Sequence, residues 1–344
     1  MSTRRPPKLR DDVVTLAHGA GGKATRNLVE GLFVPAFANP LLAPLGDSAV
    51  LDVGGARIAF TTDSYVVKPL FFAGGDIGDL AVNGTVNDLA AAGARPVALS
   101  AGFVIEEGFA VADLRRIAAS MAAAAARVGV PVATGDTKVV ERGNADGLYI
   151  TTAGVGVVPA GLELGPHRVR PGDRVLVSGT IGDHGMAVMV ARGDLQLEVD
   201  LASDTAPVHE LTQALLALGE EVRWLRDPTR GGLATALNEV AQAANLAVVL
   251  DEGSLPVRPE VVGTCEILGI DPLYVASEGR IVAVVSAEAC EAALVALQAH
   301  PLGAGAAVVG EIRSEPQGFV LLDTSFGGSR IVDMLVGDPL PRIC

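Results

Sequence analysis

The chain has 344 residues, which at about 100–200 residues per domain predicts two domains or three. Its 40 acidic side chains outnumber 26 basic ones, and the formal net charge of −14 excludes nucleic acids and anionic membranes as expected partners. No apolar stretch free of charged or amide side chains reaches the ~18 residues of a membrane span. The basic N-terminus leads into Asp11 and Asp12 without an apolar signal core, so we expect a cytoplasmic protein.

In chain order, the first half alternates short β-branched runs with alanine-rich helical runs. The expected strands and helices are a hairpin of strands 49–53 and 57–61, a helix 77–92, a strand 96–105, a helix 111–128 and a strand 148–158. Residues 161–171 contain Gly, Pro and His without a period and mark a boundary between domains.

The alternation resumes beyond this boundary. We expect strands at 174–178, 222–225, 246–250, 280–285, 308–312 and 319–322, and helices near 186–192, 207–218, 233–244 and 287–300. The pattern predicts a mixed α/β (α+β) protein, and it leaves open whether each sheet is parallel or antiparallel. The expected organisation is a segment 1–40 with a glycine-rich loop, domains 41–160 and 168–333, and a tail 334–344.

Four aspartates of the first half share one context. Each stands beside Gly, Asn or Thr at or near the end of an apolar element, and they are Asp47, Asp63, Asp88 and Asp136. Carboxylates in such places can converge on one edge of a sheet, where they suit Mg²⁺ and its bridged phosphates. The alternative for any one of them is an ordinary turn or helix cap, which is the more common role of a single Asp.

Two further features of the first half could contact phosphate. Lys138 follows the expected strand 131–134 and Asp136, although by itself it would be an ordinary surface lysine. The glycine-rich loop 18–23 precedes an expected helix 25–33 and could offer backbone N–H groups. It is no Walker A motif, because Ala17 and Ala24 stand where Gly and Ser or Thr belong.

The second half contains one dense motif and one isolated acid. In residues 226–233, Pro228 fixes a turn and a glycine pair allows close backbone approach, with Asp227 and Arg230 beside them. A well-made strand–loop–helix connection is the alternative. Glu278 precedes an apolar strand, where partial burial would raise its pKa and make it a base; a solvated loop acid is the alternative.

The three cysteines are Cys265, Cys290 and Cys344, an odd number without CxxC or HExxH, so neither a disulfide framework nor a zinc site is expected. Cys265 and Cys290 lie in apolar helical contexts and are expected to be inert. Cys344 ends a proline-containing tail, 337–344, that could span roughly 25–30 Å. It is either a thiol that swings into a site or a frayed terminus.

The chain beyond Val13 resembles the HypE family of hydrogenase maturation proteins, within the PurM-like superfamily of aminoimidazole ribonucleotide synthetase. The matching motifs are HGAGGK (18–23), GDSAVL (46–51), TTDSYVV (61–67), GDIGDLAVNGTVNDLAAAGARP (75–96), GDTKVV (135–140), DPTRGGLA (227–234), ASEGR (276–280) and PRIC (341–344). The aspartate motifs and the Gly-Gly loop belong to the superfamily and imply ATP, whereas the terminal PRIC is specific to this family.

The resemblance implies a two-domain α/β protein that forms a homodimer through its N-terminal domains, with ATP bound near that interface. A HypF carbamoyltransferase would place a carbamoyl group on Cys344. ATP-dependent dehydration would then give S-cyanide, which passes to iron on a HypC–HypD complex for the nickel–iron hydrogenase centre.

The resemblance also assigns roles to residues. The carboxamide oxygen on Cys344 would attack the γ-phosphate of ATP, Lys138 would stabilise the transferring charge and Glu278 would remove the nitrogen proton. Mg²⁺ would be held by Asp47, Asp63, Asp88 and Asp136. The residues expected to bind the nucleotide and its metal are Gly19, Gly21, Gly22, Asp47, Asp63, Asn87, Asp88, Asp136, Thr137, Asp227 and Arg230.

Two other kinds of protein stay open. One is a different PurM-like kinase or synthetase, such as thiamine-phosphate kinase or selenophosphate synthetase; the latter needs a reactive residue near the N-terminus, and here no cysteine precedes Cys265. The other is a scaffold that binds nucleotide only to place its tail. Turnover that requires the chain's own modified tail distinguishes the dehydratase from both.

Overall fold

The computed structural model describes residues 11–193, 197, 199–337 and 340–344. A first sheet has the order β1-β2-β7-β5-β6, in which only the β5–β6 pair is parallel. Its strands are β1 (Ala49–Val53), β2 (Ala56–Tyr65), β5 (Arg95–Glu106), β6 (Val132–Val140) and β7 (Leu148–Val158). A small hairpin of β3 (Phe71–Phe72) and β4 (Gly75–Asp76) leads into the first long helix.

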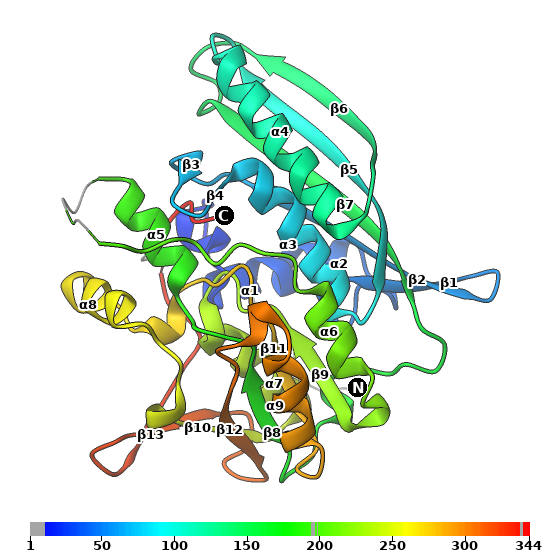
Figure 1. The fold of residues 1–344 in the computed structure, drawn as a ribbon, viewed down its shortest axis with the longest axis vertical. Helices are drawn as coiled ribbons and strands as arrows, with labels where there is room; N and C mark the ends of the chain where they lie inside the picture. The colour runs from blue at the N-terminus through cyan, green and yellow to red at the C-terminus, as the bar shows by residue number, and fades with distance from the viewer. Residues whose placement is uncertain (1–10, 194–196, 198, 338–339) are drawn as a thin grey trace.

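That helix, α3 (Ile77–Ala91), packs on β2 and β7, and α4 (Val111–Val128) packs on α3, so both cover the same face of the sheet (Figure 1). Asp76 caps α3 by accepting hydrogen bonds from the N–H groups of Gly78 and Asp79. The helix ends before Gly93, which has φ +73°. Almost every residue of α3 is buried, because it lies between the first sheet and the second domain.

A second sheet has the order β14-β13-β10-β12-β8-β11-β9, with only β10 and β13 parallel among its pairs. Its strands are β8 (Arg174–Val177), β9 (Val222–Arg226), β10 (Ala247–Asp251), β11 (Val282–Val285), β12 (Ala307–Arg313), β13 (Val320–Asp323) and β14 (Ser329–Ile331). The helices of this domain are α5 (Asp183–Ala191), α6 (His209–Leu216), α7 (Gly232–Ala244), α8 (Pro259–Leu268) and α9 (Cys290–Gln298).

The expected mixed α/β architecture is confirmed, and both sheets are mixed, which periodicity had left open. The bounds of β1, α4 and β7 agree with the predicted ranges. The expectation for β6 was wrong: the strand does not stop at residue 134 but runs to Val140, because it pairs with β5 along residues 99–106. Sequence reasoning also missed α8 and β14.

Before the first sheet lie two short helices, α1 (Lys23–Leu28) and α2 (Val34–Ala36), joined by a π-helical turn. Over the described residues, the helices are too short or too polar for any of them to traverse a lipid bilayer.

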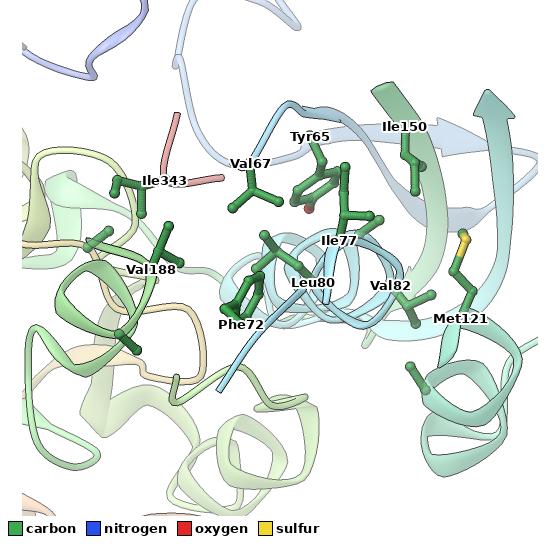
Figure 2. Packing of buried hydrophobic residues seen from close by; sticks show 14 of the residues in the cluster. Tyr65, Val67, Phe72, Ile77, Leu80, Val82, Met121, Ile150, Val188 and Ile343 are labelled. Atoms are coloured by element: carbon green, nitrogen blue, oxygen red, sulfur yellow. The ribbon is translucent and has the colours of Figure 1, made fainter. Parts of the chain in front are cut away.

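One apolar cluster joins the two domains and the C-terminus. It contains Tyr65, Ile77 and Leu80 of the first domain, Val188 of α5, and Ile343 of the tail. Figure 2 shows Ile343 and Val188 at one end of this cluster, with Val67 as the next labelled side chain. Burial of an aliphatic side chain contributes roughly 1.5–3 kcal/mol, so this contact favours a docked tail.

Candidate active site

The C-terminal residues lie inside the molecule, along the segment that follows β2. The backbone N–H of Val66 donates to the Cys344 carbonyl (3.2 Å), and that of Lys68 donates to the Arg342 carbonyl (3.2 Å). The Arg342 side chain donates to the Val66 carbonyl (3.0 Å) and forms an ion pair with Asp146. The tail therefore docks alongside residues 66–68 through backbone hydrogen bonds and an ion pair at Arg342.

Cys344 lies beside a cavity of about 80 Å³. Gly19, Arg230, Gly231 and Tyr274 contribute to its wall, together with the tail itself. A single water needs only about 10–15 Å³ on this measure, so the cavity has room for a small group on the thiol.

Charged side chains influence the Cys344 thiol. Burial raises its pKa far above the ordinary value, Arg230 lowers it, and Glu278 and Asp63 raise it further. Conversely, the interaction with Cys344 makes the largest contribution to raising the pKa of Arg230. One cation and three carboxylates, the third being Asp227, therefore act on the group that the thiol would carry.

Glu278 is only 2% exposed, and its position is set by backbone contacts. Its N–H donates to Asp204 Oδ1 (3.0 Å), and its carbonyl accepts from Asn87 Nδ2 (2.6 Å). Its Oε1 has no hydrogen-bond partner among the described residues, and the nearest basic atom is His184 Nε2 at 4.0 Å. Burial raises the pKa of Glu278 well above its ordinary value, which makes its carboxylate a stronger base.

Three aspartates form a compact acidic cluster. Ligand oxygens of Asp47, Asp88 and Asp227 all lie within 4.8 Å of one another. Burial, followed by the charge of Asp227, raises the pKa of Asp88 well above its ordinary value. Burial raises the pKa of Asp227 to about 6, and Arg226 opposes that rise. Arg226 also pairs with Asp47 (2.9 Å).

These three carboxylates fit a divalent cation. Mg²⁺ prefers hard oxygen ligands, and its charge would offset the repulsion among the three carboxylates. Asp63 stands between the cluster and the tail: its Oδ1 is 3.7 Å from Arg230 Nη2. Arg230 thus faces the acidic residues on one side and Cys344 on the other.

Three predicted site residues lie elsewhere within the chain. Asp136, Thr137 and Lys138 are on β6, at the edge of the first sheet. The side chains of Asp136 and Lys138 are 69% and 68% exposed and pair with each other (2.8 Å). The edge strand is three strand positions from β2, which is roughly 14 Å at the usual spacing. One chain does not bring them to the acidic cluster.

The glycine-rich loop holds the root of the tail. The N–H of Lys23 donates to the Leu335 carbonyl (2.9 Å), and that of Gly21 donates to Thr25 Oγ1 (2.9 Å). A Cβ at Gly22 would lie 2.1 Å from the Leu335 oxygen, and one at Gly21 would lie 2.6 Å from the Arg230 oxygen. Gly19 has nothing so near. Gly21 and Gly22 therefore allow the loop to pack closely against Arg230 and Leu335.

Asn87 is fully buried and ties α3 to the second domain. Its amide donates to the carbonyls of Ala206 (3.0 Å) and Glu278 (2.6 Å), and its oxygen accepts from the N–H of Val208 (2.8 Å). One amide hydrogen therefore helps to place Glu278, and the other holds the segment that precedes α6.

Sequence reasoning missed several residues that contact the tail. His184 lies in the first turn of α5, and its Nε2 is 3.0 Å from the Ile343 carbonyl. Arg192 donates to the Arg342 carbonyl (2.9 Å), and Asp146 pairs with Arg342. His184 could have been noticed as a polar residue in the apolar run that forms α5. It lies just before residue 186, where the helix was expected to begin.

Comparison with known proteins agrees with this architecture. The family models for the N-terminal and C-terminal domains of AIR synthase related proteins match residues 45–158 and 170–323. The carbamoyl dehydratase HypE of Bradyrhizobium diazoefficiens is 55% identical over 342 residues, which cover 99% of both chains.

Two solved structures are also similar. A crystal structure of a HypE–HypF complex matches with a TM-score of 0.85 and 47% identity over 90% of this chain and 99% of that one. HypE in complex with ATP matches with a TM-score of 0.81 and 44% identity over 96% and 100%. With both domains matched in order and the relative aligned along its full length, the chain belongs to the HypE family of AIR synthase related proteins.

Proposed function

We propose that the chain is an ATP-dependent carbamoyl dehydratase that converts an S-carboxamide on its own Cys344 to S-cyanide. The observation that carries the proposal is the docked tail. Cys344 and Arg230 line the same cavity, and His184 Nε2 lies 3.0 Å from the Ile343 carbonyl and 4.0 Å from Oε1 of the buried Glu278. The name of the Bradyrhizobium relative and the ATP complex of another family member support the activity and the nucleotide.

The chemical difficulty lies in the amide oxygen, which is a poor leaving group. ATP, when bound, supplies a phosphoryl group to that oxygen, which can then depart as phosphate. Arg230 faces the position of the carbamoyl group and would stabilise negative charge on this oxygen. The enclosed position of the tail excludes water while the group reacts.

Glu278 is the proposed base. The carbamoyl nitrogen carries two protons: one would be released when the oxygen is phosphorylated, and the other, which Glu278 would accept, leaves as the C–O bond breaks and phosphate departs. Glu278 has an unpartnered Oε1 and a raised pKa, so it can accept a proton in this dry environment. His184 is less suited, since its Nε2 is engaged with the Ile343 carbonyl.

Mg²⁺ would be held by Asp47, Asp88 and Asp227, with Asp63 next to them, and it would supply charge neutralisation for the triphosphate. The three proposed ligands include two of the four aspartates expected from the sequence, Asp47 and Asp88, and add Asp227. Asp136 takes part only if another chain brings it near.

We propose a homodimer for that reason. All of β6 except Val140 is exposed, and apolar side chains are exposed on the first sheet at Phe60, Val97 and Val139. Among the described helices, α3 and α4 lie on one face of this sheet (Figure 1). Pairing of two such sheets would bury the apolar residues and would let Asp136, Thr137 and Lys138 reach the nucleotide of the other protomer.

Complementation tests this arrangement. Asp88→Asn and Lys138→Ala are each expected to abolish dehydration, and re-folded mixtures are expected to recover about a quarter of the wild-type rate, since half of the dimers would have one intact site. No recovery in mixed dimers verified by sedimentation would place Lys138 in its own chain's site.

A HypF-type carbamoyltransferase is the proposed donor, in accord with the HypE–HypF complex of a relative. A HypC–HypD complex is the proposed acceptor of cyanide, as the sequence resemblance implies.

Mass spectrometry of Cys344 tests the reaction. The protein would be incubated with carbamoyl phosphate, ATP, Mg²⁺ and the carbamoyltransferase, with Cys344→Ser as the control. We expect a carbamoyl adduct that loses one water only when ATP is present. An adduct that never dehydrates would favour a scaffold, and ATP binding without any adduct would favour a small-molecule kinase.

A further inference from the structure

His184 makes two hydrogen bonds that connect the second domain to the tail. Its side chain is fully buried, with Nδ1 2.8 Å from Ser203 Oγ and Nε2 3.0 Å from the Ile343 carbonyl. Phe72 packs edge-on against the ring, with 5.5 Å between the centroids. These contacts fix both the plane of the ring and its distance from the tail.

The partners also determine which nitrogen carries the proton. Ser203 Oγ accepts from the N–H of Thr205 (3.1 Å), so its own hydrogen is free to be donated to His184 Nδ1. The ring proton is then on Nε2, where the Ile343 carbonyl accepts it. A neutral ring satisfies every partner, in agreement with the pKa of His184, which burial lowers to about 4.

We propose that His184 is a positioning residue that holds the C-terminal tail in its inward position, with Ser203 orienting the ring. Ile343 precedes Cys344 directly, so a hydrogen bond at its carbonyl fixes the approach of the thiol to Arg230. The inference rests on the proposed function, in which Cys344 carries the reacting group, but it concerns docking, which can be measured without turnover.

The other polar ties of the tail differ in their surroundings. The ion pair of Arg342 with Asp146 lies at a site where the Asp146 side chain is 44% exposed, so water and salt weaken it. The His184 bond is buried, and breaking it leaves a donor without its acceptor. Glu278 Oε1, 4.0 Å from Nε2, is then the nearest alternative acceptor. Withdrawal of the tail would therefore pair His184 with the proposed base.

The test is the alkylation rate of Cys344 by iodoacetamide, measured by peptide mass spectrometry on the full chain without nucleotide. His184→Leu removes both hydrogen bonds at similar volume, and His184→Gln keeps an amide donor. Loss of a hydrogen bond worth about 1.4 kcal/mol predicts a roughly tenfold faster reaction for His184→Leu. We expect His184→Gln to stay near the wild-type rate and Ser203→Ala to fall between them.

Two internal controls separate docking from general loosening. Cys265 is buried in α8, in the same extended apolar cluster as Ile343, and its alkylation is expected to stay slow in every variant unless the domain itself loosens. His300 pairs with Glu210 (3.1 Å) in the second domain, and His300→Gln is expected to change nothing at Cys344.

An unchanged Cys344 rate in His184→Leu overturns the proposal, as does an equal rise at Cys265. If His184→Leu does not fold, Ser203→Ala decides: an unchanged rate there also refutes it. Failure of the proposed function is a separate result, because wild-type protein would then never dehydrate a carbamoyl group while the alkylation rates still report docking.

Discussion

Acidification should destabilise the folded protein through His184, and the variant His184→Gln isolates this effect. The pKa of His184 is lowered by burial from its ordinary value of 6.5 to about 4. Between pH 6.5 and pH 4, His184 is protonated in the unfolded chain but neutral in the folded chain. Stability is therefore lost as the pH falls from 6.5 towards 4.

The magnitude follows from the size of the shift. The drop in the pKa of His184 from 6.5 to about 4, at about 1.36 kcal/mol per pH unit, corresponds to a loss of roughly 3 kcal/mol in the free energy of unfolding. Glu278 is the acidic group that faces the ring, at 4.0 Å, and any charge that it keeps at low pH would reduce the loss. We therefore expect acidification from pH 7 to pH 4 to lower the free energy of unfolding by about 2–3 kcal/mol through His184.

Urea unfolding of wild type and His184→Gln at pH 7, 5.5 and 4 measures the effect. As the pH falls from 7 to 4, the wild type should lose about that much more free energy of unfolding than His184→Gln. Deleting residues 340–344 exposes the ring and should shrink the shift. Equal pH dependence in wild type and variant would refute the buried neutral histidine.

Other substitutions test the remaining parts of the site. Glu278→Gln should slow dehydration of carbamoylated Cys344 by about 10²–10⁴-fold without lowering thermal stability, whereas Glu239→Gln, a neighbouring acid that pairs with Arg226, should keep the rate; a normal rate in Glu278→Gln assigns the base elsewhere. Arg342→Ala should speed alkylation of Cys344 severalfold at low salt and less at high salt, and no salt dependence would contradict the ion pair with Asp146. Asp88→Asn should weaken Mg²⁺ binding in calorimetry by at least tenfold, and unaltered binding would remove Asp88 from the proposed metal site.

Local patterns determined much of this protein. The helix 111–128 and the strands 49–53 and 148–158 could be placed from periodicity, because each buries one face at a regular interval. Cys344 could be singled out because the other two cysteines lie in apolar helical runs. The motifs around Asp47, Asp88 and Asp227 were sufficient to recognise the superfamily, and the terminal PRIC indicated the family within it.

Only the tertiary structure decided which of these residues meet. Asp227 of the second domain joins Asp47 and Asp88, which precede that domain in the sequence, whereas the edge position of β6 leaves Lys138 apart from them within one chain. The inward tail depends on His184 and Ile343, which are 159 residues apart. Such contacts arise from the packing of α5 between the two domains, and no local period or motif encodes which distant carbonyl a buried side chain will reach.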